Sequence, residues 1–309
     1  MTRTDLDARA ARFVNYDAVL ADALPKRRKI ASRLGALCWL AAPEDTSPTD
    51  LARKTLDVFE TLRASGWRFN TLTRISVAAS AAAAGRSGAA VLEGYETWRG
   101  APQLARRLLA AQGVRAGGLG GEDRLDDLLA VLGPRWWRGD KPVLSLWAAA
   151  FLVEGVSASA LEHKLSAADS ALDQAGVTGR KARLARPAIA YADPNTLAAL
   201  PQRYAQLQEA RRQDGYLRKF GPADLVRLAA LAEPQLASHA AIQAEETLRN
   251  LRPRLSASFR PALRGPLSRA LIAPNPVQGL LAGHLVSRVE QSQAAAASGG
   301  AAIVVMGSS

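Results

Sequence analysis

The feature that most constrains this chain is a unit that returns roughly every 40 residues. Each unit reads as an apolar helix rich in small residues, a polar turn and an amphipathic helix. The first helices of successive units are expected to begin near Lys29, Leu72, Leu104, Val143, Arg180 and Ala223. One helical hairpin cannot bury its apolar face alone, whereas stacked hairpins cover one another. The pattern therefore predicts an all-α fold of stacked antiparallel helical hairpins, α-solenoid-like, with a compact orthogonal helical bundle as the alternative.

Helical spacing within the units supports this class. Leu161, Leu165, Ala168 and Leu172 recur at intervals of four, three and four residues, which places them on one helix face. Pro187 and Pro201 fall inside expected helices and should kink or shorten them. The side chains that we expect to be buried in the later units are Leu165, Leu200, Tyr204 and Leu248.

The arrangement resembles the tetratricopeptide and HEAT-type α-solenoids over roughly residues 28–256. The resemblance is one of architecture, because the tetratricopeptide signature of Trp, Leu-Gly and Tyr at fixed offsets occurs in no unit. Residues 1–27 are expected to form an N-terminal helical cap, and residues 257–290 a Pro- and Arg-rich segment with a capping helix. Residues 291–309 are expected to be a flexible linker followed by a short extended C-terminal tail.

Composition restricts where and with what the protein acts. The chain carries 40 Lys and Arg against 28 Asp and Glu, a net charge of +12, which favours anionic partners. It has no apolar run long enough to span a membrane and no secretory signal, so a cytoplasmic protein is expected. The single cysteine, Cys38, excludes an internal disulfide and a cysteine metal cage, and it is expected to be buried.

Motifs for catalysis are not found. There is no Walker-type phosphate loop and no His-Glu-x-x-His motif, and His163, His239 and His284 fall on different hairpins, where we expect them to be solvated. The adjacent carboxylates Asp126-Asp127 and Glu245-Glu246 should diverge around their helices as solvated charges. We therefore predict no catalytic residue, no metal site and no cofactor.

Three segments are candidate binding sites. Arg135, Trp136, Trp137 and Arg138 form a loop whose indoles can stack on bases or anchor a protein partner, or instead seal the seam between two hairpins. A run of arginines without an acidic residue can bind phosphates, or can instead be a solvated helix end. It comprises Arg249, Arg252, Arg254, Arg260, Arg264 and Arg269. Ile303, Val304 and Val305 lie in the expected extended tail, which can add to a partner's sheet edge or groove, or fray.

These features predict a non-enzymatic helical-repeat scaffold or adaptor that binds another protein. The alternative is a basic solenoid that binds nucleic acid or another polyanion, with a HEAT-like DNA-repair enzyme as a less favoured variant. Binding to DNA or RNA that weakens steeply with salt would favour the alternative.

Overall fold

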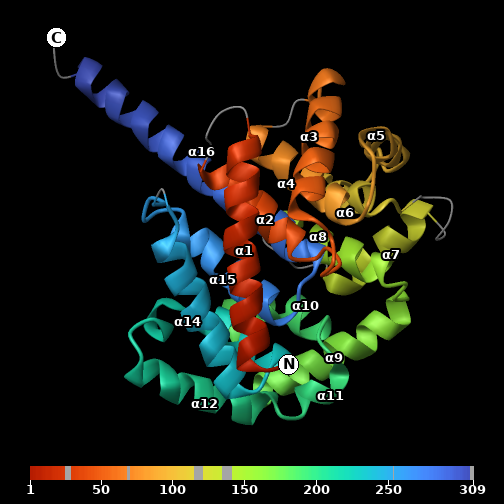
Figure 1. Ribbon diagram of the computed structural model, residues 1–309. Helices are drawn as coiled ribbons and strands as arrows, with labels where there is room; N and C mark the ends of the chain where they lie inside the picture. The colour runs from red at the N-terminus through yellow and green to blue at the C-terminus, as the bar shows by residue number, and fades with distance from the viewer. Residues whose placement is uncertain (25–28, 68–69, 115–120, 134–140, 253, 307–309) are drawn as a thin grey trace.

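The computed structural model describes residues 1–24, 29–67, 70–114, 121–133, 141–252 and 254–306. Within these ranges the chain forms helices and contains no strand, which confirms the all-α class (Figure 1). The helices of the predicted units begin and end within a few residues of the expected positions. Their bounds are α2 Lys29–Trp39, α3 Pro48–Ala64, α4 Thr71–Ala83, α5 Gly88–Thr97, α6 Gln103–Gln112, α7 Gly121–Leu132, α8 Lys141–Val153, α9 Ala158–Gln174, α10 Gly179–Ala190, α13 Pro222–Leu231 and α14 Pro234–Asn250.

The helices that pack in pairs are not the two helices of each predicted hairpin. Between the two ends of the chain, each pair joins the second helix of one predicted hairpin to the first helix of the next. α1 (Arg3–Ala23) packs along α2, and the same relation joins α3 to α4, α5 to α6, α7 to α8, α9 to α10 and α14 to α15. The two helices of a predicted hairpin diverge instead, and α4 and α5 meet at an angle of 109°. Only the four residues Ala84-Gly85-Arg86-Ser87 separate them, so the chain turns a corner there. The predicted pairing was therefore wrong, and α1 belongs to the first pair.

The pairs form a closed circuit of contacts. α2, α4, α6 and α8 each contact the next, and α8, α10, α13 and α15 (Arg260–Ile272) continue the row. α1 contacts α2 and α3 at one end of this row and α14 and α15 at the other. Arg9 strengthens that closure, because its guanidinium donates to the carbonyl oxygens of Leu271 and Ile272 at 2.9 and 2.7 Å.

The last helix, α16 (Pro276–Met306), crosses the middle of this circuit. Its first part contacts α2, α4, α6, α8 and α15, and its later part leaves the body of the molecule (Figure 1). The predicted capping helix at 277–290 is thus present, whereas the expected linker and extended tail are helical as far as Met306. The run of four alanines at residues 294–297 explains the difference, because alanine has the highest intrinsic helix propensity.

Prolines lie in two further elements. α15 forms within the Pro- and Arg-rich segment, with Pro261 in its first turn, where no backbone donor is needed, and Pro266 in its interior. Pro201 lies at the start of α12 (Leu200–Gln213), so the helix expected there is shortened, as predicted, and α11 (Pro194–Leu197) precedes it as a separate short helix. A short 3₁₀ turn, η2 (Leu217–Lys219), follows α12.

The predicted core positions are confirmed. Leu165, Leu200, Tyr204 and Leu248 are buried, and so is Cys38. No single helix in the described ranges is both long and apolar enough to cross a membrane, although the bent pair α4–α5 reaches the required length and composition together.

Candidate functional site

A cavity of about 910 Å³ lies where α4, α6 and α8 begin, beside the end of α7 and one face of α16. Its wall is assembled from segments far apart in the sequence. Thr73 follows the start of α4, Leu129 belongs to α7, and Ser287 lies on α16. The closure of the helix circuit around α16 therefore creates this space.

Three helix N-termini contribute to the wall. Asn70 is the N-cap residue of α4, Pro102 is the N-cap residue of α6, and Lys141 is the first residue of α8. The first N–H groups of a helix have no acceptor within the helix, and that end carries a partial positive charge. The Asn70 side chain accepts a hydrogen bond from the backbone N–H of Thr73 at 2.8 Å, whereas Pro102 provides no such bond for α6. The wall is thus electropositive before any side-chain charge is considered.

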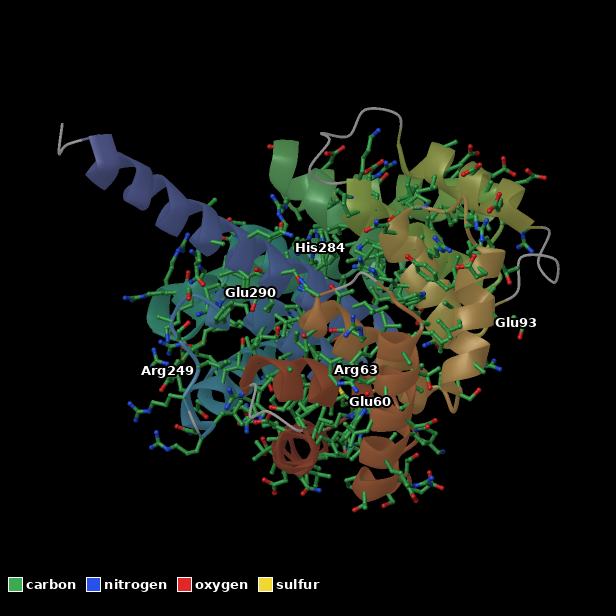
Figure 2. The ribbon with its side chains drawn as sticks, turned by 90° about the horizontal axis from the view of Figure 1, so that it is seen from above. Glu60, Arg63, Glu93, Arg249, His284 and Glu290 are labelled. Atoms are coloured by element: carbon green, nitrogen blue, oxygen red, sulfur yellow. The ribbon has the colours of Figure 1, made fainter. Side chains whose placement is uncertain are left out.

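Four side chains that are basic or can become so line the same cavity. Arg107 comes from α6 and Lys141 from α8, while His284 and Arg288 come from α16. His284, Ser287, Arg288 and Gln291 recur at intervals of three, one and three residues, so they share one face of α16. Figure 2 shows His284 on this helix near the middle of the molecule.

The four side chains differ in depth. Arg107 and His284 are half-buried, and Lys141 and Arg288 are exposed at the mouth of the cavity. Burial lowers the pKa of the Arg107 guanidinium from its ordinary value. Burial is also the main reason why the pKa of His284 is lowered, and the positive charges of Arg288 and Arg107 lower it further.

No carboxylate is found among the described residues that line the cavity. Most arginines elsewhere in the described structure lie beside an acidic partner, as Arg203 does with Glu233 and Arg186 with Asp169. The described wall of the cavity gathers four basic side chains and no acidic one. The chemistry of such a wall is that of an anion site.

The remaining wall is mixed in polarity. Leu104, Leu129 and Leu144 provide apolar surface, and Gln103 and Ser145 provide hydrogen-bonding groups. A cavity of this volume is within the range of small-molecule sites, which combine apolar walls with a few polar groups that fix orientation. It is much larger than one bare anion requires.

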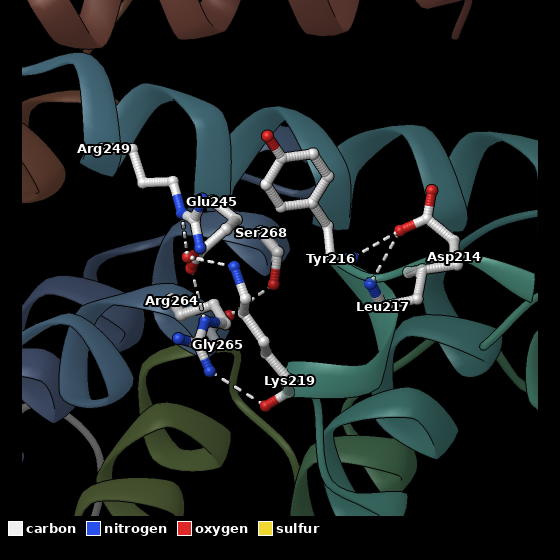
Figure 3. A network of polar contacts seen from close by, with 9 residues as sticks. All are labelled: Asp214, Tyr216, Leu217, Lys219, Glu245, Arg249, Arg264, Gly265 and Ser268. Atoms are coloured by element: carbon white, nitrogen blue, oxygen red, sulfur yellow. Dashed lines mark hydrogen bonds and ion pairs between the residues drawn. The ribbon is translucent and has the colours of Figure 1, made fainter. Parts of the chain in front are cut away.

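The arginine run does not form the predicted surface. Arg264 donates to the buried carboxylate of Glu245 at 2.7 Å, and Arg249 and Lys219 donate to the same carboxylate at 2.9 Å each (Figure 3). Glu245 was expected to be solvated, but its side chain is 1% exposed. It is buried because these three cations satisfy it.

The other members of the run are divided. Arg269 is buried and donates to Asp224 and to Gln278 at 3.2 and 3.0 Å. Arg252 and Arg254 are exposed between α14 and α15, and Arg260 is half-buried at the start of α15. None of the run lines the 910 Å³ cavity. The structure therefore separates residues that the sequence presented as one cluster.

The other predicted binding residues fall on or beyond the limits of the described structure. Arg135, Trp136, Trp137 and Arg138 lie outside the described residues, although Gly133 and Lys141 on either side of that segment line the cavity. Ile303, Val304 and Val305 belong to the last turns of α16, and their side chains are not described.

The histidines were only partly predicted. His163 is exposed, as expected, and His239 lies 2.8 Å from Asp7 between α14 and α1. His284 is not solvated, because α16 is enclosed by other helices. The signal that sequence reasoning missed was the polar face from His284 to Gln291 on a helix whose other face is apolar. Within the described ranges, no group of three His, Cys, Asp or Glu side chains is placed to hold a metal ion.

Comparisons with known proteins add no assignment. No family model, no curated protein and no solved structure matches this chain.

Proposed function

We propose that this protein binds a small organic anion, of the class of phosphate monoesters and about the size of a mononucleotide, in the 910 Å³ cavity. The observation that carries the proposal is the convergence of Arg107, Lys141 and Arg288 with three helix N-termini on a wall whose described residues include no carboxylate. Arginine and helix N-termini are the groups that proteins commonly use for phosphate oxygens.

The size of the cavity supports an organic body attached to the anion. Leu104, Leu129 and Leu144 offer that body an apolar surface, and Gln103 and Gln291 offer amide groups that can hydrogen-bond to it. The proposed ligand is an anion, which is the kind of partner that the net charge of +12 favours. It replaces an extended polyanion with a compact ligand, because the basic groups line one cavity of about 910 Å³ rather than a long surface. The protein-binding scaffold favoured by the sequence stays a prediction.

The test is calorimetric titration of the full chain with inorganic phosphate, sulfate, a mononucleotide and a sugar phosphate. We expect the organic phosphates to bind more tightly than the inorganic ions. Arg288→Gln and Lys141→Gln each remove one charge at the mouth and should raise Kd about tenfold, since a charged hydrogen bond contributes roughly 1.5–3 kcal/mol when it is shielded and less when it is exposed.

Arg254→Gln is the matched control. It removes one exposed arginine away from the cavity and should leave Kd unchanged within error. Absence of binding by all four compounds, or equal weakening by Arg254→Gln and Arg288→Gln, would contradict the proposal.

A further inference from the structure

His284 occupies a distinctive position in the cavity wall. Its Nε2 atom is buried and has no hydrogen-bond partner among the described residues. Less than 1 Å² of this atom is accessible, so His284 lines the cavity with the rest of its ring, and it senses an anion there through charge rather than through a hydrogen bond from Nε2.

The charged groups among the described residues that line the cavity with His284 are all positive. Arg107 comes from α6, Lys141 from α8 and Arg288 from α16 itself, whereas α4 contributes the neutral side chains of Asn70 and Thr73. An imidazolium at His284 would add a positive charge beside those of Arg107, Lys141 and Arg288. In the empty cavity the ring is therefore held neutral, in agreement with its lowered pKa.

An oxyanion in the cavity reverses this balance. It offsets the charges of Arg107 and Arg288, which disfavour an imidazolium at His284. We infer that the cavity takes up its anion together with one proton, which the ring of His284 holds. The inference rests on the proposed function and adds its regulation by pH. The proton comes from the solvent, and no covalent bond of the ligand changes.

The direction of the pH dependence follows from linkage. Anion binding raises the pKa of His284. Binding therefore takes up protons at pH values between the pKa of His284 in the free protein and its pKa in the complex with the anion. Affinity is highest below this interval and falls as the pH rises through it. A difference of one unit between the two pKa values corresponds to a change of about tenfold in Kd.

Sulfate is the suitable probe, because it stays dianionic between about pH 5 and pH 8, where histidine titrates. Calorimetric titration in buffers of different ionisation enthalpy, at about pH 6.5, gives the number of protons taken up. For the unmodified chain we expect an uptake of a substantial fraction of one proton, and a Kd for sulfate that rises with pH.

His284→Gln should abolish the proton uptake and flatten the pH dependence. His163→Gln, which replaces an exposed histidine on α9, should behave as the unmodified chain. Should His284→Gln fail to fold, nuclear magnetic resonance of the three histidine rings in the unmodified chain measures the same quantity directly. We expect the pKa of one ring to rise when sulfate is added.

The outcomes separate this inference from the proposed function. Sulfate binding without proton uptake overturns the inference and leaves the anion site standing. Proton uptake that persists in His284→Gln also overturns it, because another group then carries the proton. Failure of sulfate and of the organic phosphates to bind removes the proposed function and, with it, the inference.

Discussion

At the scale of single residues, Glu245 shows how this basic chain buries charge. One carboxylate of α14 receives hydrogen bonds from Lys219 on η2, Arg249 on α14 and Arg264 on α15 (Figure 3). Burial alone would raise the pKa of Glu245, but the three hydrogen bonds outweigh it and lower that pKa to about 2. The network joins three elements, so its effect reaches beyond one helix.

Glu245→Gln should therefore destabilise the fold. The variant leaves three cations around a neutral amide, and breaking a buried ion network by removing one partner costs about 3–5 kcal/mol. Chemical denaturation of the two proteins at neutral pH measures the difference. Glu246→Gln is the control, because the neighbouring side chain is less buried, and it should cost no more than about 0.5 kcal/mol. Equal effects of the two variants would contradict the role of the network.

The same carboxylate should make stability depend on pH in acid. Its pKa is about 2 in the folded protein and near 4.3 in an unfolded chain. A lowered pKa in the folded state stabilises the protein above the unfolded value, and that contribution is lost as the pH falls from about 4.3 to about 2. Glu245→Gln should show a flatter loss of stability over this interval, measured by denaturation at a series of pH values.

At the scale of elements, α16 determines whether the cavity exists. Two glycines let it approach its neighbours closely. A Cβ atom at Gly279 would lie 3.0 Å from the Cα of Cys38 in α2, and one at Gly283 would lie 2.6 Å from the hydroxyl oxygen of Ser76 in α4. Contact with backbone atoms cannot be relieved by a side-chain rotation, so Gly279 fixes the distance between α16 and α2.

Gly279→Ala should thus destabilise the protein in spite of the better helix propensity of alanine. We expect a cost of about 1–3 kcal/mol from overpacking. Thermal or chemical denaturation tests this, with Gly215→Ala as the matched control, because a Cβ atom at Gly215 meets no atom within 4 Å. A stabilised Gly279→Ala variant would mean that α16 does not pack as described. The variant should also weaken anion binding, since His284 and Arg288 lie on the displaced helix.

The elements were largely predictable from sequence, and their pairing was not. The helix starts expected near Leu72 and Val143 match those of α4 and α8 closely, because proline and capping residues mark them. Loops before and after each helix are similarly short, so the sequence offered no sign of which neighbour each helix packs against. The tail beyond residue 290 was misread because its β-branched residues were weighted above the alanines that precede them.

The candidate site was not predictable for a related reason. Arg107, Lys141 and His284 have no local spacing that relates them, and only the packing of α16 against α6 and α8 brings them to one cavity. Their residue types predict an anion site only after that packing is known. Conversely, the arginines after Arg249 are close in sequence, but α15 turns some of them inward to Glu245 and Asp224.

At the scale of the whole molecule, α1 holds the two ends of the helix circuit together. It contacts α2 and α3 on one side and α14 and α15 on the other, and it buries Leu6, Phe13, Tyr16 and Leu20. Arg9 adds a cation at the C-terminal carbonyls of α15, where the helix dipole favours positive charge. The stability of both ends therefore depends on one helix.

Phe13→Ala should lower the free energy of unfolding by about 3–5 kcal/mol, because Phe13 is 1% exposed and its removal leaves a cavity in the core. Val14→Ala tests the adjacent position, which is exposed, and should change the stability by no more than about 0.5 kcal/mol. Hydrogen exchange should show faster exchange in both α2 and α14 of Phe13→Ala. Faster exchange in only one of them would mean that α1 does not bridge the ends.

The central position of α16 has a consequence for biosynthesis. The ribosome releases α2 and α4 long before α16, yet α16 covers the faces that carry Cys38 and Ser76. Until residues 276–287 emerge, those faces stay open to water and to other nascent chains, which is the situation in which chaperones bind. Pairs such as α1–α2 can form during translation, but the anion cavity can form only after the helices around it have been made and α16 follows them.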